Sequence, residues 1–304
     1  MAKLYTVLGS NGNIGKLIVA DLKRRGLAVR PIDRQQANLL DAAQTIDTLK
    51  GSSHAFVAIG LPYKTRVWQD QWPVIMRNII AAAKKVGCKV IFFDNIYMYG
   101  PAPLKVPITE QHSQQPPSNM GKVRKQIADM LMHANKLGAI QATIARCADF
   151  YGPQASHGVL NMNVIDRMLT GKKPRWLGNP YVKHSFAYAP DAARATVVLG
   201  LSSNSYGKIW HLPVDAPAMT VKDIVNYINK KLGSNLSLSV PSPAMLSFIG
   251  LFAPMVKEAA GMSYQFDTDY VMSCDKFMKT HPEFRITSYK DGLANTLSEK
   301  RQLV

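Results

Sequence analysis

A run of three glycines near the start of the chain constrains the fold more than any other feature. Residues Gly9–Gly15 read GSNGNIG, which gives the spacing GxxGxxG, and they follow an apolar stretch at 3–8. Behind them, apolar residues recur at helical spacing over 14–25. Glycines between a strand and a helix permit a tight turn and let a pyrophosphate approach the backbone at the helix N-terminus. We therefore predict a dinucleotide-binding unit. Its cofactor-binding residues are predicted to be Gly9, Asn11, Gly12, Asn13, Ile14 and Gly15.

The alternation of strands and helices continues to about residue 150. Short apolar or β-branched stretches predict strands, and stretches with helical periodicity lie between them. The predicted strands are 3–8, 28–32, 55–59, 89–93 and 139–145, and the predicted helices are 14–25, 42–50, 72–86 and 119–137. Repeated strand–helix–strand units are typical of the α/β class, here a Rossmann doubly wound parallel sheet. We expect its crossovers to be right-handed.

Beyond residue 150 the pattern is looser, and Pro and Gly become frequent. The sequence predicts helices near 157–170, 190–201 and 220–232, and a core or pocket-lining helix at Met245–Met255. We interpret residues 151–304 as mainly a smaller C-terminal substrate-binding lobe. The dinucleotide-binding domain is expected to span 1–150, with 180–200 returning to it.

The end of the second predicted strand should select the cofactor. An acidic residue there binds the adenine ribose hydroxyls of NAD, whereas an arginine pairs with the 2′-phosphate of NADP. Asp33 and Arg34 are adjacent in the sequence, so both interpretations stay open. Arg30 and the positive net charge favour NADP over NAD.

The chain is strongly basic, with 37 Lys and Arg against 20 Asp and Glu and a formal net charge of +17. Such a charge favours anionic partners, among them a phosphate-bearing cofactor, nucleic acid or an acidic membrane surface. The short basic clusters lie mostly at the ends of predicted helices, where the helix dipole favours cations. The sequence contains no zinc-finger or RNA-binding motif. We therefore expect a small-molecule substrate and no nucleic acid.

Cysteine usage and hydropathy indicate the compartment. Cys88, Cys147 and Cys274 are scattered and form no CxxC motif, so we predict reduced thiols and no metal site. The N-terminal stretch has the pattern of a strand and not of a signal peptide. No stretch reaches the roughly 18 apolar residues of a membrane span. We predict a cytoplasmic protein without a membrane span.

Several segments resemble the extended or atypical short-chain dehydrogenase/reductase superfamily, in particular its NAD-dependent epimerase/dehydratase group. They are the glycine run and the segments 55–63, 78–101, 146–153 and 184–195. The resemblance implies a bound NAD or NADP and hydride transfer to a small carbonyl or sugar-type substrate. Members of the superfamily often dimerise through the helices that correspond to 72–86 and 119–137, so the resemblance also implies a homodimer.

The catalytic residues of that superfamily are replaced in this chain. The resemblance implies a Ser or Thr that polarises the substrate oxygen and a Tyr-x-x-x-Lys pair that transfers the proton. Asn95 stands in the Ser/Thr position. If Lys122 is the lysine, Ser118 stands where the tyrosine belongs. If the register begins two residues earlier, Met120 replaces the lysine as well.

Two other tyrosines offer a hydroxyl. Tyr97 and Tyr99 closely follow a predicted strand, at the sheet edge where ligands bind. A phenol there can act as an acid if a neighbouring cation, Lys122 or Arg124, tunes it. Packing in a turn is the alternative for both tyrosines. The one Tyr-x-x-x-Lys motif, Tyr227 to Lys231, lies outside the expected place in the topology. The candidate catalytic residues are Asn95, Tyr97 and Lys122.

Candidate substrate contacts follow from the same resemblance. Arg146 and Asp149 correspond to a segment that reaches the substrate pocket, where many members carry Asn at the position of Asp149. An Asp there disfavours an anionic nucleotide-sugar substrate. Asp94 could instead have a structural role in an Asx turn. His184 could instead be a buried histidine whose polar atoms are satisfied within the protein. The predicted substrate residues are Asp94, Tyr99, Arg146, Asp149 and His184.

Three functions are compatible with these observations. The first is an oxidoreductase or epimerase with atypical catalytic residues. The second is a non-catalytic NAD(P)-binding redox sensor or scaffold, which would keep the glycines and lose the tyrosine. The third is a basic protein that binds a membrane surface or nucleic acid. A tyrosine hydroxyl and a cation within hydrogen-bond reach of the nicotinamide would favour the first.

Overall fold

The computed structural model describes residues 3–101, 103–241 and 264–302. The chain forms two compact units. Unit 1 contains residues 1–98, 119–147 and 192–212, and unit 2 contains residues 99–118, 148–191 and 213–304. The expected domain 1–150 is therefore interrupted by the segment 99–118, and the segment that returns to it is 192–212, whereas we expected 180–200. The predicted helix Met245–Met255 lies outside the described residues.

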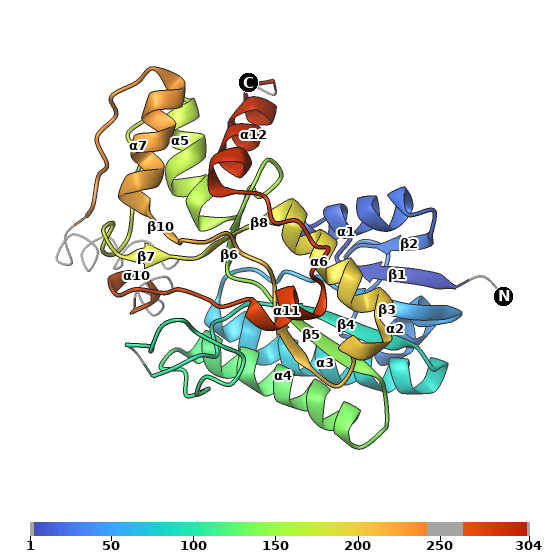
Figure 1. Ribbon diagram of the computed structural model, residues 1–304. Coiled ribbons are helices and arrows are strands. Elements are labelled where there is room, and N and C mark those ends of the chain that lie inside the picture. The colour runs from blue at the N-terminus through green and yellow to red at the C-terminus, as the bar shows by residue number, and fades with distance from the viewer. Residues whose placement is uncertain (1–2, 102, 242–263, 303–304) are drawn as a thin grey trace. The chain divides into compact units, whose positions relative to one another are not determined.

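Unit 1 is built on a six-stranded sheet with the order β2-β1-β3-β4-β5-β9, in which all neighbouring strands are parallel. The strands are β1 (Leu4–Leu8), β2 (Ala28–Ile32), β3 (Ser52–Val57), β4 (Lys89–Asp94), β5 (Ala142–Arg146) and β9 (Ile209–His211). The helices are α1 (Asn13–Arg24), α2 (Ala42–Leu49), α3 (Thr65–Val86), α4 (Asn119–Lys136) and α6 (Ala189–Leu201) (Figure 1). The predicted doubly wound parallel sheet of the Rossmann type is confirmed.

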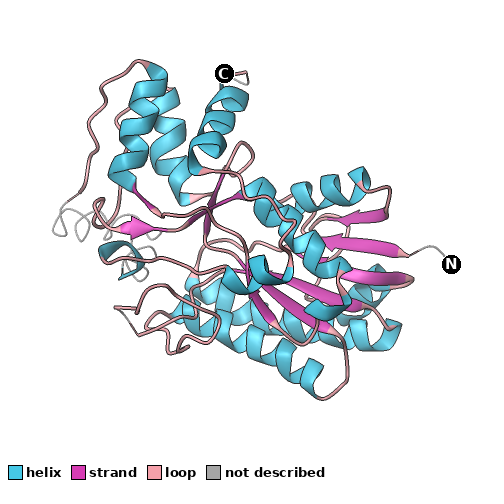
Figure 2. Ribbon diagram, viewed as in Figure 1, coloured by secondary structure: helices cyan, strands magenta, loops and turns pink. Residues whose placement is uncertain are grey.

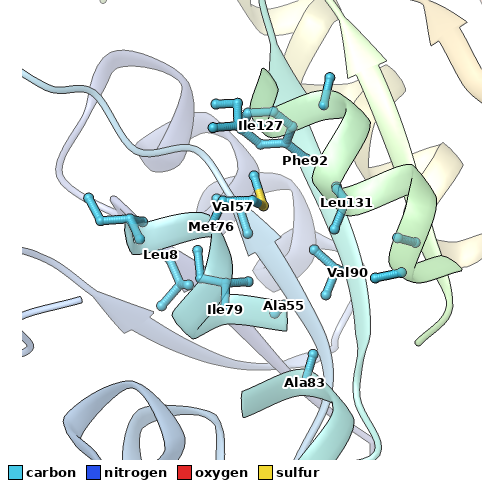
Figure 3. Packing of buried hydrophobic residues seen from close by; sticks show 14 of the residues in the cluster. Leu8, Ala55, Val57, Met76, Ile79, Ala83, Val90, Phe92, Ile127 and Leu131 are labelled. Atoms are coloured by element: carbon cyan, nitrogen blue, oxygen red, sulfur yellow. The ribbon is translucent and has the colours of Figure 1, made fainter. Parts of the chain in front are cut away.

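The two faces of this sheet pack against different helices. Side chains alternate along each strand, so Val57 and Phe92 join a buried cluster with residues of α3 and α4 (Figure 3). Phe56 and Ile91 point to the opposite face, toward Gly200 of α6. There a Cβ atom on Gly200 of α6 would lie 2.5 Å from the Phe56 ring, which shows how closely this helix approaches the sheet. Figure 2 shows the strands of unit 1 with helices on both sides.

The largest differences from the prediction in unit 1 concern α3 and β9. Helix α3 begins at Thr65 and not near residue 72, and it contains Pro73 in its interior. A proline is favoured in the first turn of a helix, which explains why the sequence suggested a start close to Pro73. Burial of Trp68 supports the additional turns. The strand β9 was not predicted, because its three residues are too few to show a periodicity.

Unit 2 contains two small sheets and several helices. Strand β6 (Asp149–Tyr151) is parallel to β8 (Phe186–Tyr188), and β7 (Lys183–His184) is antiparallel to β10 (Met219–Thr220). The helices are a π-helix at Asn161–Ile165, α5 (Asp166–Leu169), α7 (Val221–Leu232), α10 (Tyr264–Asp267), α11 (Asp275–Thr280) and α12 (Tyr289–Arg301). A cluster of buried residues from α7, α12, the π-helix and the strands forms its core. Within the described part of the chain, no helix has the length and apolar character needed to cross a membrane.

Candidate cofactor and active site

The loop Gly9–Gly15 packs so closely that side chains cannot replace its first and last glycines. The backbone N–H groups of Gly9 and Ser10 donate to the Ile32 carbonyl at 2.9 and 3.0 Å, which ties the loop to the end of β2. Gly9 has a φ of 83°, and a Cβ atom there would lie 2.6 Å from the Ala58 carbonyl oxygen. A Cβ atom on Gly15 would lie 2.0 Å from the Gly9 carbonyl oxygen. The turn therefore requires glycine at both positions.

The N-terminus of α1 is open to an anion. Gly12 is the N-cap residue, and within the described residues no side chain caps it. The first turn, which begins with Asn13 and Ile14, contains no acidic residue. The first backbone N–H groups of a helix lack intrahelical acceptors and carry a partial positive charge. This arrangement fits a dinucleotide pyrophosphate.

The structure gives Arg30, near the end of β2, a role other than cofactor binding. Arg30 donates through Nη1 to the carbonyl oxygens of Thr48 and Lys50, at 3.0 and 2.9 Å. These carbonyls lie at the C-terminal end of α2, so Arg30 stabilises that helix end, and its expected contribution to NADP binding is not supported. Arg34 is exposed. Asp33 accepts a hydrogen bond from the Asn11 side chain.

A buried ion-pair group lies at the carboxyl ends of β4 and β5. Asp94 and Arg146, paired in register as the last residues of these strands, are fully buried. Arg124 of α4 donates its Nε to Asp94 Oδ1 at 2.7 Å and its Nη2 to the same oxygen, and Arg146 Nε lies 3.4 Å from Oδ2. The Arg124 guanidinium also lies over the rings of Trp72 and Phe92, at 4.8 and 4.9 Å. Asp94 and Arg146 therefore hold the strand ends and α4 together, and their contact with substrate stays a prediction.

Helix α4 buries one of the two candidate lysine positions and exposes the other. Met120 and Arg124, one turn apart, are both buried, whereas Lys122 is exposed. Residues four apart share one helix face, and residues two apart lie on opposite faces. The pair that faces the core is thus Met-x-x-x-Arg. Arg124, which the sequence suggested only as an alternative cation, takes the buried position beside Asp94, and the catalytic role of Lys122 stays a prediction.

The segment after β4 forms an Asx turn. Asn95 Oδ1 accepts from the backbone N–H of Tyr97 at 3.1 Å, and the Asn95 N–H donates to Asp94 Oδ1 at 2.9 Å. Among the described residues, the Asn95 Nδ2 has no hydrogen-bond partner, so this amide can donate to a ligand. The Tyr97 ring stacks on Trp68 with centroids 6.3 Å apart. Trp68 in turn lies 5.8 Å from the Arg124 guanidinium.

Unit 2 contains the remaining predicted residues. Asp149 Oδ2 lies 2.9 Å from His184 Nε2, so the structure brings these two side chains together. His184 is 2 % exposed, and its ring stacks on Phe266 and Tyr270. The His184 Nδ1 is buried without a hydrogen-bond partner in the described part of the structure. Asp149 retains 16 % exposure, and it can present its carboxylate to a ligand.

Three further tyrosines, Tyr99, Tyr264 and Tyr227, lie in unit 2. Tyr99 is fully buried with its ring edge-on to His112, and its contact with substrate stays a prediction. Tyr264, which the sequence analysis missed, has a side-chain hydrogen bond with Ser118, and burial raises its pKa to about 12. No sequence signal marks Tyr264, because its partner is far away in the chain. Tyr227 donates to the Lys290 carbonyl and belongs to α7, away from α4 in the topology. No group of three His, Cys, Asp or Glu side chains in the described ranges could hold a metal ion.

A parallel doubly wound sheet with a glycine loop between β1 and α1 defines the chain as a dinucleotide-binding protein of the Rossmann class. The sequence profile of the NAD-dependent epimerase/dehydratase family matches residues 5–210. The chain belongs to this family. No curated protein sequence matches the chain significantly.

Similar solved structures are enzymes with the same fold. The UDP-glucose 4-epimerase of Thermus thermophilus, in complex with NAD, has a TM-score of 0.77 and 18% identity, with coverage of 99% of this chain and 100% of that chain. The UDP-glucose 4-epimerase of Thermotoga maritima, with UDP-glucose, has a TM-score of 0.79 and 16% identity, with coverage of 99% of both chains. The GDP-mannoheptose C4 reductase of Campylobacter jejuni, with NADP bound, has a TM-score of 0.78 and 16% identity, with coverage of 99% and 98%. At these identities the likeness shows the fold.

Proposed function

We propose that the protein is an NADP-dependent oxidoreductase that acts on a small carbonyl or sugar-type substrate. The observation that carries this proposal is the loop Gly9–Gly15, whose close packing and uncapped helix N-terminus suit a dinucleotide. When bound, the nicotinamide supplies hydride-transfer chemistry. Family membership supports an enzyme of the epimerase, dehydratase or reductase type. The exposed guanidinium of Arg34, beside the engaged carboxylate of Asp33, supports NADP over NAD.

The chain's own residues can replace the usual catalytic groups near β4. The Nδ2 of Asn95 is available to donate a hydrogen bond to a substrate oxygen, while its Oδ1 is held by the Tyr97 N–H. The phenol of Tyr97 is the candidate acid, because it closely follows β4 and its ring is fixed against Trp68. Lys122 and Arg124 both stay candidates for the cation. Lys122 is exposed, whereas Arg124 is paired with Asp94 and lies 5.8 Å from the Trp68 ring on which Tyr97 stacks.

Unit 2 supplies the candidate substrate contacts. Asp149 is the partly exposed member of the pair with His184, and a carboxylate accepts hydrogen bonds from hydroxyl groups but repels phosphates. This chemistry favours a substrate that offers hydroxyl or amine donors to Asp149. His184 orients the carboxylate from the buried side.

Calorimetric titration with NADPH, NADP, NADH and NAD tests the proposal. We expect the phosphorylated pair to bind more tightly and NADPH to be oxidised by at least one member of a panel of aldehydes, diketones and nucleotide sugars. The variant Gly12→Ala is the specific control, because its Cβ atom would lie 3.2 Å from the Gly9 carbonyl oxygen, a contact that small shifts relieve. It should fold and lose dinucleotide affinity.

Other outcomes would redirect the assignment. If no dinucleotide binds the wild-type protein, the proposed function is wrong. If oxidised and reduced forms bind equally and no carbonyl compound is reduced, the protein is a sensor or scaffold. The homodimer stays a prediction, which light scattering on the eluate of a sizing column would test.

A further inference from the structure

The carboxylate of Asp33 is already engaged by its own surroundings. Its Oδ1 accepts from the backbone N–H groups of Gln35 and Gln36, at 2.8 and 3.2 Å. Its Oδ2 accepts from the Asn11 Nδ2. A carboxylate offers about four lone-pair positions, two on each oxygen. Three of these positions are therefore used before any ligand binds.

This occupancy disables the usual way in which an acid at the end of β2 recognises NAD. Pairing with both ribose hydroxyls needs an outward lone pair on each carboxylate oxygen. Both lone pairs of Asp33 Oδ1 are directed at the turn, and only one on Oδ2 is left. Asp33 is thus a weak acceptor for a ribose, although its position in the sequence is that of an NAD selector.

Asn11 is placed to maintain this state because the loop that carries it is fixed. Asn11 lies between Gly9, whose N–H is bonded to the Ile32 carbonyl, and Gly12, whose N–H donates to the Gly9 carbonyl at 3.0 Å. The same Ile32 ends β2, directly before Asp33. The donor and the acceptor are therefore carried by neighbouring backbone positions.

The contact also changes the electrostatic balance for a phosphate. An unpaired carboxylate beside the adenine ribose repels a 2′-phosphate, whereas hydrogen-bond donors on the carboxylate reduce this repulsion. The exposed Arg34, next in the chain, then contributes the attractive charge. Attraction by Arg34 alone would compete with the adjacent Asp33 if that carboxylate were free.

We propose that Asn11 determines the dinucleotide specificity of this protein, by occupying an acceptor position of the Asp33 carboxylate that an adenine ribose would need and so favouring NADP over NAD. This inference rests on the proposed function, since it requires that a dinucleotide binds the loop Gly9–Gly15. It assigns to Asn11 a role in selection and not only in phosphate binding.

A double-mutant cycle tests the coupling between the two residues. The dissociation constants of NADP and NAD are measured calorimetrically for the wild-type protein, Asn11→Ala, Asp33→Ala and the double variant. We expect Asn11→Ala to tighten NAD roughly five-fold, which is the value of one recovered hydrogen bond, and to weaken NADP by at least as much. In the Asp33→Ala background, the same Asn11 substitution should change the NAD-to-NADP ratio less than about two-fold.

A matched control and the contrary outcomes complete the test. Gln36→Ala removes the side-chain acceptor of the Asp33 N–H at 2.8 Å and leaves the carboxylate contacts in place, so it should not change the ratio. If Asn11→Ala weakens NADP and NAD equally, Asn11 binds the pyrophosphate only, and the inference is overturned. It is also overturned if the ratio changes by the same factor with and without Asp33. If the wild-type protein binds neither dinucleotide, the proposed function itself fails.

Discussion

Arg124 donates two hydrogen bonds to a single carboxylate oxygen of Asp94, one of them from Nε at 2.7 Å. The two side chains connect the last residue of β4 to α4, and both are buried. The same oxygen accepts the N–H of Asn95, so the ion pair supports the turn that positions Asn95 and Tyr97. The buried pair of Asp94 and Arg124 therefore supports the turn that carries the candidate catalytic residues.

Removal of Arg124 should destabilise the protein strongly. Arg124→Met fills a similar volume but leaves Asp94 buried with only the more distant Arg146 as an ion-pair partner in the described structure. Loss of one member of a buried pair costs about 3 kcal/mol in the free energy of unfolding. Urea denaturation of the wild type and the variant measures this difference.

A neighbouring pair on α4 provides the control. Lys125 and Asp129 form an exposed ion pair, and such pairs contribute about 0.5 kcal/mol or less. Lys125→Met should therefore leave the unfolding midpoint almost unchanged. If Lys125→Met and Arg124→Met change the unfolding midpoint equally, the contact between Arg124 and Asp94 does not stabilise the protein as a buried ion pair.

The glycine loop predicts a second contrast, between two Gly→Ala substitutions. At Gly15 the new methyl group would lie 2.0 Å from the Gly9 carbonyl oxygen, and this backbone atom cannot move without opening the turn. At Gly60, apart from the glycine itself and its two chain neighbours, no heavy atom of the described chain lies within 4 Å of the added Cβ. We expect Gly15→Ala to lower the thermal midpoint by several degrees or to prevent folding, and Gly60→Ala to be neutral. Differential scanning calorimetry compares them, and a stable Gly15→Ala protein would contradict the close approach.

The strands of the sheet could be predicted well because each is a short apolar stretch between segments with helical periodicity, a pattern that is visible in the local sequence. The strand Ala28–Ile32 was predicted with the same ends as in the structure, and the glycine loop was placed between the correct strand and helix. The interruption of the first domain by residues 99–118 could not be predicted, since it depends on contacts with segments far away in the chain.

The candidate site was less accessible to sequence analysis. The residue type favours Lys122, yet the cation that α4 buries is Arg124, on the opposite side of the helix. Arg30 looked like a cofactor residue, although its guanidinium binds the end of α2. In both cases the contacts of the residue depend on where its side chain points. The spacing of residues along the sequence does not show this direction.

The stability of unit 1 should decrease in mild acid through His54. Burial, together with the nearby charges of Lys89 and Lys3, lowers the pKa of His54 to about 4. The folded state therefore keeps this imidazole neutral while the unfolded chain takes up a proton below about pH 6.5. The contribution of His54 is complete above about pH 6.5 and is lost as the pH falls from there toward the folded-state pKa of about 4.

The variant His54→Phe isolates this effect, because it can keep the stacking on Tyr5 and cannot be protonated. Its urea midpoint should fall less between about pH 7 and about pH 5 than that of the wild type. His133→Gln, at an exposed position on α4, serves as the control. An identical pH dependence in His54→Phe and the wild type would exclude His54 as the titrating group.

Removal of the Tyr97 hydroxyl should separate catalysis from cofactor binding. Tyr97→Phe retains the ring that stacks on Trp68, so the fold and the affinity for NADP should be unchanged. If the phenol transfers a proton, kcat for the carbonyl compound that the wild type reduces should fall roughly 10²- to 10⁴-fold. Tyr181→Phe, at a tyrosine that is 71 % exposed, should retain full activity. An unchanged kcat in Tyr97→Phe would shift the search for the acid to Tyr264, whose hydroxyl bonds to Ser118.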